Sequence, residues 1–451
     1  MAEEILDGAD PPSCVEHGRW TSVPVHPHPL RLKDVDKKGY SRAKKTGSIS
    51  WHMVGCSGDP DNHLPQTAVA QAMKAQVRAG DPGGKGKAIP VEPSFFYHLG
   101  DIVYKPEVEP GAPVPAEPTE HDLTVLYRDQ FYIPYGKYGK PIFAIAGNHD
   151  GKIHVDADTG LVKPDKSPIY RFQQRFMSEI SQISLPTELV DVEGSVSTCA
   201  QPGIYWTLET PAVSVIGLYT NVVNGGQLDA PDDSYTPQMR WLIHELTRLT
   251  EEEKRRPIVI ASHYPPYSGA SNFQQRGNPN LSLTPRGQDR ILQPLATILA
   301  HAYELSGVRP DLVVSAHAHH YQRITYRFSD GYEIPHLIAG CGGHGPVEEI
   351  VKNCDGTVGT EPVAPYPVVI PGGYNFPAGD SATVDAYNDR DFGFLRFTSD
   401  GKNIRGEFFT VPEVSGRVTK SGKRTTGALL ADSFVVACSP DPTLHKVQGI
   451  D

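Results

Sequence analysis

Side chains that can bind metal ions occur in five short segments of this chain. Gly100-Asp101-Ile102-Val103-Tyr104 and Gly147-Asn148-His149-Asp150 offer a carboxylate, a phenol, an amide and an imidazole. Ser262-His263 and His317-Ala318-His319 add three more imidazoles, and Gly55-Cys56-Ser57-Gly58 comes before all of these. Oxygen and nitrogen donors of this kind suit hard to borderline divalent or trivalent cations. The set predicts a metal site if the fold brings the segments together.

Each segment directly follows an apolar run that is typical of a buried strand. The runs are Ile49–Gly55, Phe95–Leu99, Pro141–Ala146, Pro257–Ala261 and Leu312–Ser315. Stretches with helical spacing of apolar residues separate some of them, at Thr67–Val77, Gln238–Leu249 and Leu292–Ala300. This alternation favours an α/β fold. In open α/β sheets, ligands bind in the crevice at the carboxyl ends of the strands, so the five segments are expected to converge there.

Taken singly, each segment has a simpler interpretation. Asp101 alone fits a turn or a helix cap, Asn148 a turn, and His263 a packed histidine. The pair His317 and His319 is stronger, because residues i and i+2 of an extended segment point to the same side. His320 is expected to point the other way and not to bind metal. The order and strand-end placement of all the segments together carry the prediction.

Composition excludes several classes of protein. The chain has 451 residues, 38% hydrophobic and 21% charged, as in an ordinary globular protein. Its net charge of −11 does not favour a nucleic-acid partner, which would need a basic face. None of the six cysteines forms a C-x-x-C pair, so neither a zinc ribbon nor a redox dithiol is indicated.

The amino-terminal stretch MAEEILDGADPPSC has neither the basic region nor the apolar region of a signal peptide. No window approaches the roughly 18 apolar residues of a membrane helix. We therefore expect a cytoplasmic protein without a membrane partner, with secretion of a trimmed form left open. The predicted organisation is an extension over residues 1–46, one catalytic domain over 47–411 with a long loop insertion at 346–390, and a tail over 412–451.

Taken in order, the five segments resemble the calcineurin-like metallophosphoesterase superfamily, and in particular its purple-acid-phosphatase-like branch. That branch has Gly-Asp-x-Gly, Gly-Asp-x-x-Tyr, Gly-Asn-His-Asp/Glu, Val-x-x-His and Gly-His-x-His. The counterparts here are GCSG (55–58), GDIVY (100–104), GNHD (147–150), IASH (260–263) and AHAH (316–319). The resemblance covers roughly residues 48–345 and implies a four-layer α/β/β/α sandwich with two mixed β-sheets.

The resemblance also implies a centre of two metal ions: iron with zinc, manganese or a second iron. Asp101 would bridge the ions, Asn148, His263 and His317 would complete one site, and Tyr104 and His319 would belong to the other. Packing at a strand end is an equal alternative for Tyr104. His149 would stabilise or protonate the leaving oxygen as a catalytic residue. The implied reaction is hydrolysis of a small-molecule phosphate monoester by a metal-activated hydroxide.

Two residues depart from the family pattern. Ala316 replaces a glycine, and Cys56 replaces the aspartate of the first segment. A thiolate matches Zn(II) or Fe(II) better than a hard trivalent ion. Asp59 is one substitute for the missing carboxylate, and Asp61 and His63 are others without a spacing argument.

An incidental change at Cys56 in an otherwise normal enzyme is another possibility, and an empty first site is a third. The protein would then be a weakened or non-catalytic phosphate- or nucleotide-binding protein. Phosphodiesterase activity is a further alternative, and nuclease activity a weaker one. The sequence leaves the substrate, the metal identities and the oligomeric state open.

Overall fold

Two mixed β-sheets with helices outside them make up most of the described structure. The structure is a computed structural model. It describes residues 27–78, 92–105, 120–154, 159, 163, 166–177, 201–221, 236–251, 255–268, 281–284, 291–348, 366–367, 378–411, 427–441 and 443–450.

The first sheet, sheet A, has nine strands in the order β1-β5-β6-β7-β10-β12-β11-β14-β13. Their bounds are β1 Leu30–Arg31, β5 Trp206–Glu209, β6 Ser214–Gly217, β7 Ile258–Ala261, β10 Leu312–Ser315, β11 Tyr321–Arg327, β12 Glu333–Ala339, β13 Tyr366–Pro367 and β14 Ser381–Asn388. Strands β6, β7, β10 and β12 run parallel, while β11 pairs antiparallel with β12 and β14. Sheet A therefore has a parallel centre and an antiparallel edge.

The second sheet, sheet B, has seven strands in the order β18-β17-β16-β15-β2-β3-β4. Their bounds are β2 Ile49–Val54, β3 Pro93–His98, β4 Ile142–Ala144, β15 Gly393–Ser399, β16 Asn403–Thr410, β17 Leu429–Ala437 and β18 Lys446–Gly449. Only β2, β3 and β4 are parallel to one another. A separate hairpin joins β8 Leu281–Thr284 to β9 Ile291–Pro294.

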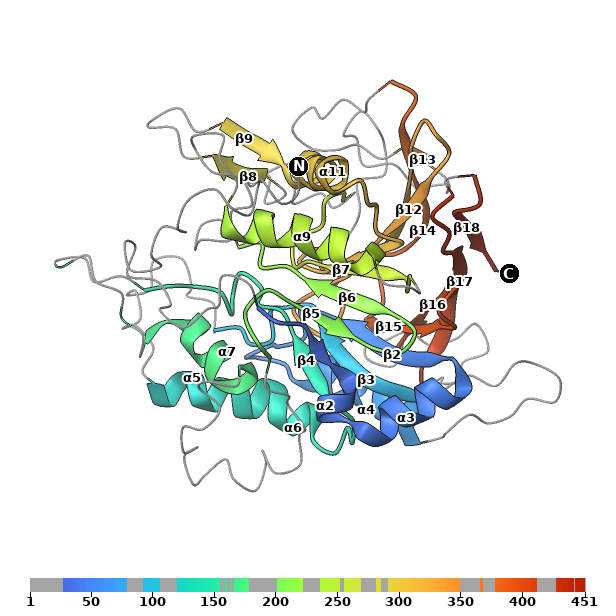
Figure 1. The fold of residues 1–451 in the computed structure, drawn as a ribbon. Coiled ribbons are helices and arrows are strands. Elements are labelled where there is room, and N and C mark those ends of the chain that lie inside the picture. The colour runs from blue at the N-terminus through green and yellow to red at the C-terminus, as the bar shows by residue number, and fades with distance from the viewer. Residues whose placement is uncertain are drawn as a thin grey trace.

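Helices lie beside both sheets, most of them on the outer faces. They are α2 Leu32–Val35, α3 Lys37–Thr46, α4 Leu64–Arg78, α5 Glu120–Tyr127, the π-helical turn η2 Arg128–Tyr132, α6 Ile133–Tyr135, α7 Pro168–Phe176, α9 Pro237–Glu251 and α11 Leu295–Ser306. Figure 1 shows α9 and α11 on one side of the strands and α3, α4, α5 and α6 on the other. Among the described helices, none is both long enough and apolar enough to cross a bilayer.

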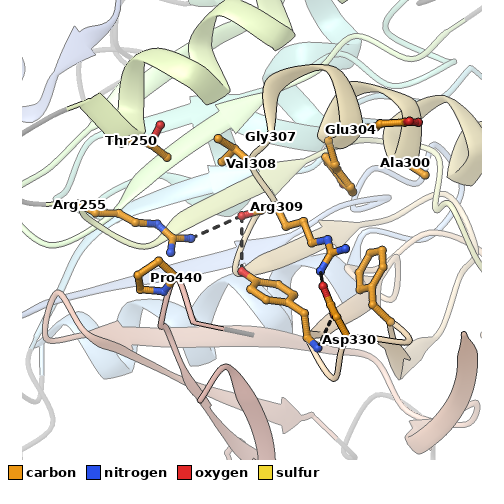
Figure 2. Close-up of a pocket in the computed structure, with 12 residues that line it drawn as sticks. Thr250, Arg255, Ala300, Glu304, Gly307, Val308, Arg309, Asp330 and Pro440 are labelled. Atoms are coloured by element: carbon orange, nitrogen blue, oxygen red, sulfur yellow. Dashed lines mark hydrogen bonds and ion pairs between the residues drawn. The ribbon is translucent and has the colours of Figure 1, made fainter. Parts of the chain in front are cut away.

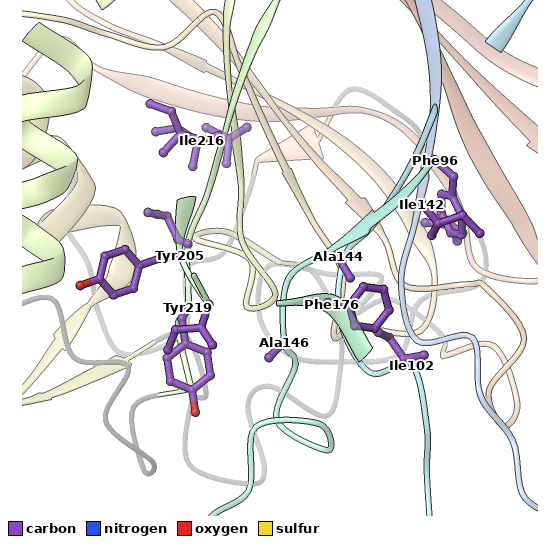
Figure 3. Close-up of a cluster of buried hydrophobic side chains, with 14 of the residues drawn as sticks. Phe96, Ile102, Ile142, Ala144, Ala146, Phe176, Tyr205, Ile216 and Tyr219 are labelled. Atoms are coloured by element: carbon purple, nitrogen blue, oxygen red, sulfur yellow. The ribbon is translucent and has the colours of Figure 1, made fainter. Parts of the chain in front are cut away.

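Alternate residues along the central strands face different cores. Trp51, Phe95 and Tyr97 of sheet B pack with Trp206 of sheet A in an inner core between the sheets, where Tyr97 and Trp206 stack at 5.7 Å between ring centroids. Residues of the opposite parity belong to outer cores under the helices; Phe96 of β3 lies beside Ile142 of β4 (Figure 3). Strands that are buried on both faces have continuous apolar runs in their sequence, which is the pattern found in the five predicted strands. The predicted four-layer α/β/β/α sandwich with two mixed sheets is confirmed.

Several segments outside the predicted core are built into the sheets. Strand β1, from the predicted N-terminal extension, pairs with β5. Strand β14 lies within the stretch expected to be an irregular insertion and pairs with β11. Strands β17 and β18, from the predicted tail, continue sheet B, because Phe434 and Val436 alternate inward into the inner core. The division of the chain into domains stays a prediction.

One helix begins later than predicted. The stretch Leu292–Ala300 was expected to be helical, but α11 starts at Leu295, and residues up to Pro294 form β9. Proline has no backbone N–H and fits only the start of a helix, so the helix begins directly after it.

Candidate metal centre

The five predicted strands lie in two sheets, and their carboxyl ends meet. Cys56, Asp101 and Asn148 follow β2, β3 and β4 of sheet B, whereas His263 and His317 follow β7 and β10 of sheet A. Backbone hydrogen bonds join the two sheets at this edge. The Gly55 N–H donates to the Ala339 carbonyl of β12, and the Gly342 N–H after β12 donates to the Gly55 carbonyl. The segments converge as expected, but between two sheets and not at the edge of one.

Three of the candidate residues have unusual backbone conformations. The φ angles of Cys56, Asp101 and His317 are 51°, 55° and 64°, in the left-handed region that non-glycine residues rarely adopt. Such conformations cost free energy and occur where the surrounding structure enforces them, often at functional sites. His317 is therefore not in an extended segment, and the i, i+2 argument for His317 and His319 was wrong in its geometry.

Glycines allow the segments to approach closely. Gly100 has a φ of 90°, and a Cβ there would come within 2.7 Å of His263 Nδ1. A Cβ on Gly147 would overlap the carboxylate of Asp101. These two positions require glycine because backbone and ligand side chains share the same space.

One group of donor atoms contains Asn148, His263 and His317. Asn148 Oδ1 lies 3.0 Å from His263 Nε2 and 2.9 Å from His317 Nδ1. The two imidazole nitrogens are 3.2 Å apart. Asp101 Oδ2 lies 3.2 Å from His263 Nε2. Four potential ligand atoms therefore surround one small volume.

A second group shares Asp101 with the first. The Tyr104 hydroxyl donates to Asp101 Oδ2 at 2.9 Å and lies 3.4 Å from His319 Nε2. Asp101 Oδ1 accepts the backbone N–H of His149 at 2.8 Å. The carboxylate of Asp101 thus lies between the two groups of donors.

The hydrogen bond at the far nitrogen of His263 sets its tautomer. Nδ1 lies 2.8 Å from the carbonyl of Leu99, which can only accept, so Nδ1 carries the proton. Nε2 then faces Asn148 and Asp101. Burial alone would lower the pKa of His263, but the carboxylate of Asp101 raises it, so Asp101 favours a proton on Nε2 at the position that a cation would take. Metal-ligating histidines typically have this arrangement, with the second nitrogen donating to a carbonyl or carboxylate.

The imidazoles and the carboxylate shift one another's pKa values. Burial by itself would raise the pKa of Asp101, but the imidazoles of His263 and His149 hold that pKa well below its ordinary value. Burial, reinforced by His263, lowers the pKa of His317, and burial lowers that of His319 to about 4. The centre thus presents an anionic carboxylate and two neutral imidazoles at neutral pH, the protonation states that metal binding requires.

Cys56, and not Asp59, lies beside these donors. The thiol is fully buried, accepts the backbone N–H of His317 at 3.2 Å, and forms a group with Asp101 and His263 whose ligand atoms all lie within 4.8 Å of one another. Burial and the nearby Asp101 raise the pKa of this thiol well above its ordinary value. A nearby cation would oppose that shift.

The other proposed substitutes are held elsewhere. Asp59 accepts the backbone N–H groups of Asp61 and Asn62 at 2.9 Å through one oxygen, and that of Gly345 at 3.0 Å through the other. Asp61 and His63 are exposed to solvent. In the described part of the chain, none of the three has a hydrogen bond or ion pair with the two donor groups, so the loop does not fold back as the substitution would require.

His149 lies next to Tyr104, with ring centroids 4.1 Å apart. Burial lowers the pKa of His149 to about 4 despite the attraction of Asp101. This imidazole is half-buried, so it borders both the donors and the space beside them.

The sequence interpretation assigned no role to three polar residues around the donors. His344 stacks on Tyr104 at 3.3 Å, and its Nδ1 donates to the Gly58 carbonyl at 2.8 Å. Glu348 accepts the His319 N–H at 3.2 Å, and its carbonyl contacts His320 Nδ1. Asp150 accepts the N–H groups of Ile102, Val103 and Gly147 and so joins two of the segments. His344 could have been found, because it too follows an apolar strand.

Comparison with known proteins identifies the family. The model for calcineurin-like phosphoesterases matches residues 66–321, a span that includes every predicted ligand and begins after Cys56. Two solved structures are similar at 12% identity. One is titled "GAP50 the anchor in the inner membrane complex of Plasmodium", with a TM-score of 0.47, covering 88% of this chain and 91% of that chain. The other is titled "Structure of PhoD", with a TM-score of 0.48, covering 90% of this chain and 72% of that chain.

No curated protein matches the chain. The family match spans more than half of the sequence and confirms the predicted superfamily. Members of this family are metal-dependent hydrolases of phosphoesters, and the convergence of oxygen, nitrogen and sulfur donors at the strand ends agrees with that chemistry. This chain belongs to the calcineurin-like phosphoesterase family.

Proposed function

We propose that this protein hydrolyses phosphate monoesters of small molecules at a centre of two metal ions. One observation carries the proposal: Asp101 Oδ2 lies 3.2 Å from His263 Nε2 on one side and 2.9 Å from the Tyr104 hydroxyl on the other. A carboxylate in this position can act as a ligand to two cations at once. Two bound ions would lower the pKa of a water molecule and neutralise charge on the phosphoryl oxygens.

The donor sets fit such ions. Asn148, His263 and His317 would complete one site, and Tyr104 and His319 would belong to the other. The family is metal-dependent. The phenol of Tyr104 motivates iron as one ion, with zinc, manganese or a second iron as the other.

We infer that Cys56 supplies the ligand that the first segment otherwise lacks. Its sulfur shares a 4.8 Å group with Asp101 and His263, whereas both oxygens of Asp59 are engaged by backbone N–H groups. On binding, the thiol proton would leave to solvent, because the thiolate is the form that binds metal. Sulfur at this position favours a softer ion such as Zn(II) or Fe(II).

His149 would act on the leaving group. Its backbone N–H holds Asp101, which fixes the residue beside the donors. The half-buried imidazole can then position a proton or a hydrogen bond near the departing oxygen. A monoester is favoured over a diester by the resemblance to the phosphatase branch, including Tyr104.

The first experiment is metal content per chain, measured by elemental mass spectrometry on the wild type, Cys56→Ala and Asp59→Asn. We expect about two ions in the wild type, as a two-metal centre requires. Cys56→Ala should lose one ion and Asp59→Asn should keep both. If Asp59→Asn loses an ion while Cys56→Ala retains two, the ligand assignment is wrong.

A parallel experiment tests the substrate class by comparing the turnover of a chromogenic phosphate monoester with that of a diester under identical conditions. Faster turnover of the diester would reverse the monoester assignment while leaving the metal centre intact.

Cys56 also motivates a second candidate function, a phosphate- or nucleotide-binding protein with weak or no catalysis. In that case Cys56→Asp should create activity or raise it steeply. A fully active wild type excludes this alternative.

A further inference from the structure

A second group of potential metal ligands lies away from the candidate metal centre. Asp311, Cys438 and His445 offer an oxygen, a sulfur and a nitrogen that all lie within 4.8 Å of one another. Asp311 immediately precedes β10, whereas His317 of the metal centre follows its other end. The two groups are therefore separated by the length of that strand. None of the family motifs includes these three residues.

The carboxylate of Asp311 is divided between two sets of partners. Oδ2 accepts the backbone N–H of Ile258 at 2.7 Å, and Oδ1 lies 3.0 Å from His445 Nε2. The guanidinium of Arg255 lies 3.4 Å from both oxygens. One oxygen is thus oriented by a backbone donor while the other faces the imidazole. This division suits a carboxylate that binds a cation through a single oxygen, because second-sphere donors orient such ligands.

The histidine and the cysteine come from the carboxyl-terminal strands. Cys438 follows β17, and His445 immediately precedes β18. The ring of His445 is fully buried and stacks on Tyr332 at 3.9 Å, which fixes its orientation. Cys438 is partly buried and contacts Asp311. The three ligand atoms are therefore held by β10 of sheet A and by two strands of sheet B.

We propose that Asp311, Cys438 and His445 bind a zinc ion that fastens strands β17 and β18 to sheet A. A mixed set of sulfur, nitrogen and oxygen donors is typical of zinc, and zinc sites in proteins are commonly tetrahedral. The proposal is independent of the proposed phosphoesterase function.

Proton release accompanies binding. The Cys438 thiol would lose its proton to solvent, and the His445 proton would move from Nε2 to Nδ1. Nδ1 is buried without a hydrogen-bond partner, so no existing bond has to break there. The thiolate formed in this way would face the Asp311 carboxylate, and the zinc ion would add to the positive charge that Arg255 already places beside that carboxylate.

A cavity lies close to the group and is lined by its neighbours, not by the three ligands themselves. Its volume is about 760 Å³, and Arg255, Pro440 and Tyr332 are among its lining residues (Figure 2). Each of these is tied to the group: Arg255 contacts Asp311, Tyr332 stacks on His445, and Pro440 follows Cys438 by two positions. Among the described residues, the group has three protein ligands. The fourth position of a tetrahedral ion would be left to a water molecule.

The test uses the full-length chain carrying Cys56→Ala and His317→Ala, which removes the other clustered thiol and a donor of the metal centre. Metal-free protein is titrated with Zn(II) alone, and separately with Co(II), whose thiolate charge-transfer absorption reports a cysteine ligand. We expect one Zn(II) per chain, a thiolate band with Co(II), and a rise in Tm on zinc addition.

Adding Cys438→Ser should abolish the thiolate band and the rise in Tm, and adding His445→Gln should weaken zinc binding. Both changes keep a polar group beside Asp311, which favours correct folding. Cys341→Ser is the matched control, because Cys341 is a buried free cysteine outside the group. Zinc stoichiometry and a cobalt band that persist in Cys438→Ser would overturn the proposal. The proposal would also be overturned if the parent variant is folded but binds no zinc.

Discussion

Asp101 contacts candidate ligands of both donor groups at the centre. One oxygen accepts the Tyr104 hydroxyl and lies near His263, and the other accepts the backbone of His149. Its φ of 55° is strained, and the backbone of Gly147 must be free of a side chain to admit its carboxylate. At the residue scale, the site depends on one aspartate whose position costs conformational energy and whose surroundings enforce it.

Replacing His149 with alanine separates its side chain from its backbone. The backbone N–H that holds Asp101 remains, so metal content should stay at the wild-type value, while kcat on a phosphate monoester should fall by about 10²–10⁴-fold. The check is elemental analysis beside steady-state kinetics. A loss of metal in this variant would mean that the imidazole has a role in the metal site and not at the leaving group. The exposed His301 serves as a control, since His301→Ala should leave both quantities unchanged.

Replacing Tyr104 with phenylalanine keeps the stacking on His344 and removes the phenol. If the protein contains ferric iron bound by this residue, the visible phenolate-to-iron absorption should disappear and one ion per chain should bind more weakly. Absorption spectroscopy on the iron-loaded protein checks this. Tyr264→Phe is the control, because it removes a phenol from a different ring at the centre, one that packs edge-on against His317 at 4.4 Å. A band that survives in Tyr104→Phe would contradict the ligand role.

At the element scale, the arrangement of two sheets places the donors. Strands β2, β3 and β4 bring their residues from sheet B, and β7 and β10 bring theirs from sheet A. The distance between the sheets is therefore a condition for a complete centre. That distance is maintained by the inner core, where Tyr97 of β3 stacks on Trp206 of β5.

Gly217 of β6 allows this close packing. A Cβ there would overlap the hydroxyl of Tyr97 and approach Ile145 Cγ2 at 2.8 Å. Gly217→Ala should therefore destabilise the protein by about 1–3 kcal/mol through overpacking, measured by urea unfolding. Gly449→Ala is the matched control, because its nearest neighbour would be 3.9 Å away. Equal stability of the two variants would show that the sheets can separate without cost.

At the scale of the whole molecule, buried neutral histidines make stability depend on pH. Burial lowers the pKa of His52, His98 and His336 from 6.5 to about 3. Their folded pKa values lie below the unfolded value, so their contribution to stability is present above about pH 6.5 and is lost as the pH falls toward 3. The unfolded chain takes up protons in this window and the folded chain does not.

We therefore expect the free energy of unfolding to decrease steadily from about pH 7 to about pH 4, as measured by urea titrations. His336→Phe should flatten this slope, because burial is the only cause of its pKa shift and its Nδ1 has no hydrogen-bond partner. The exposed His301→Phe should leave the slope unchanged. A pH profile that is the same in His336→Phe and the wild type would show that this histidine is already protonated in the folded protein.

The five strand-end segments and the α/β class could be read from the sequence, because buried strands are continuous apolar runs and polar residues directly after them are conspicuous. Asp101, Asn148, His263 and His317 were found in that way, with their order along the chain. Tertiary structure decided the rest. Two sheets meet at the centre, Cys56 and not Asp59 lies beside the donors, and His344 and Glu348 complete the surroundings. The tertiary structure also places β17 and β18 in sheet B and Cys438 and His445 beside Asp311. These contacts join residues far apart in the chain, and no local pattern or period records which distant segments will pack against each other.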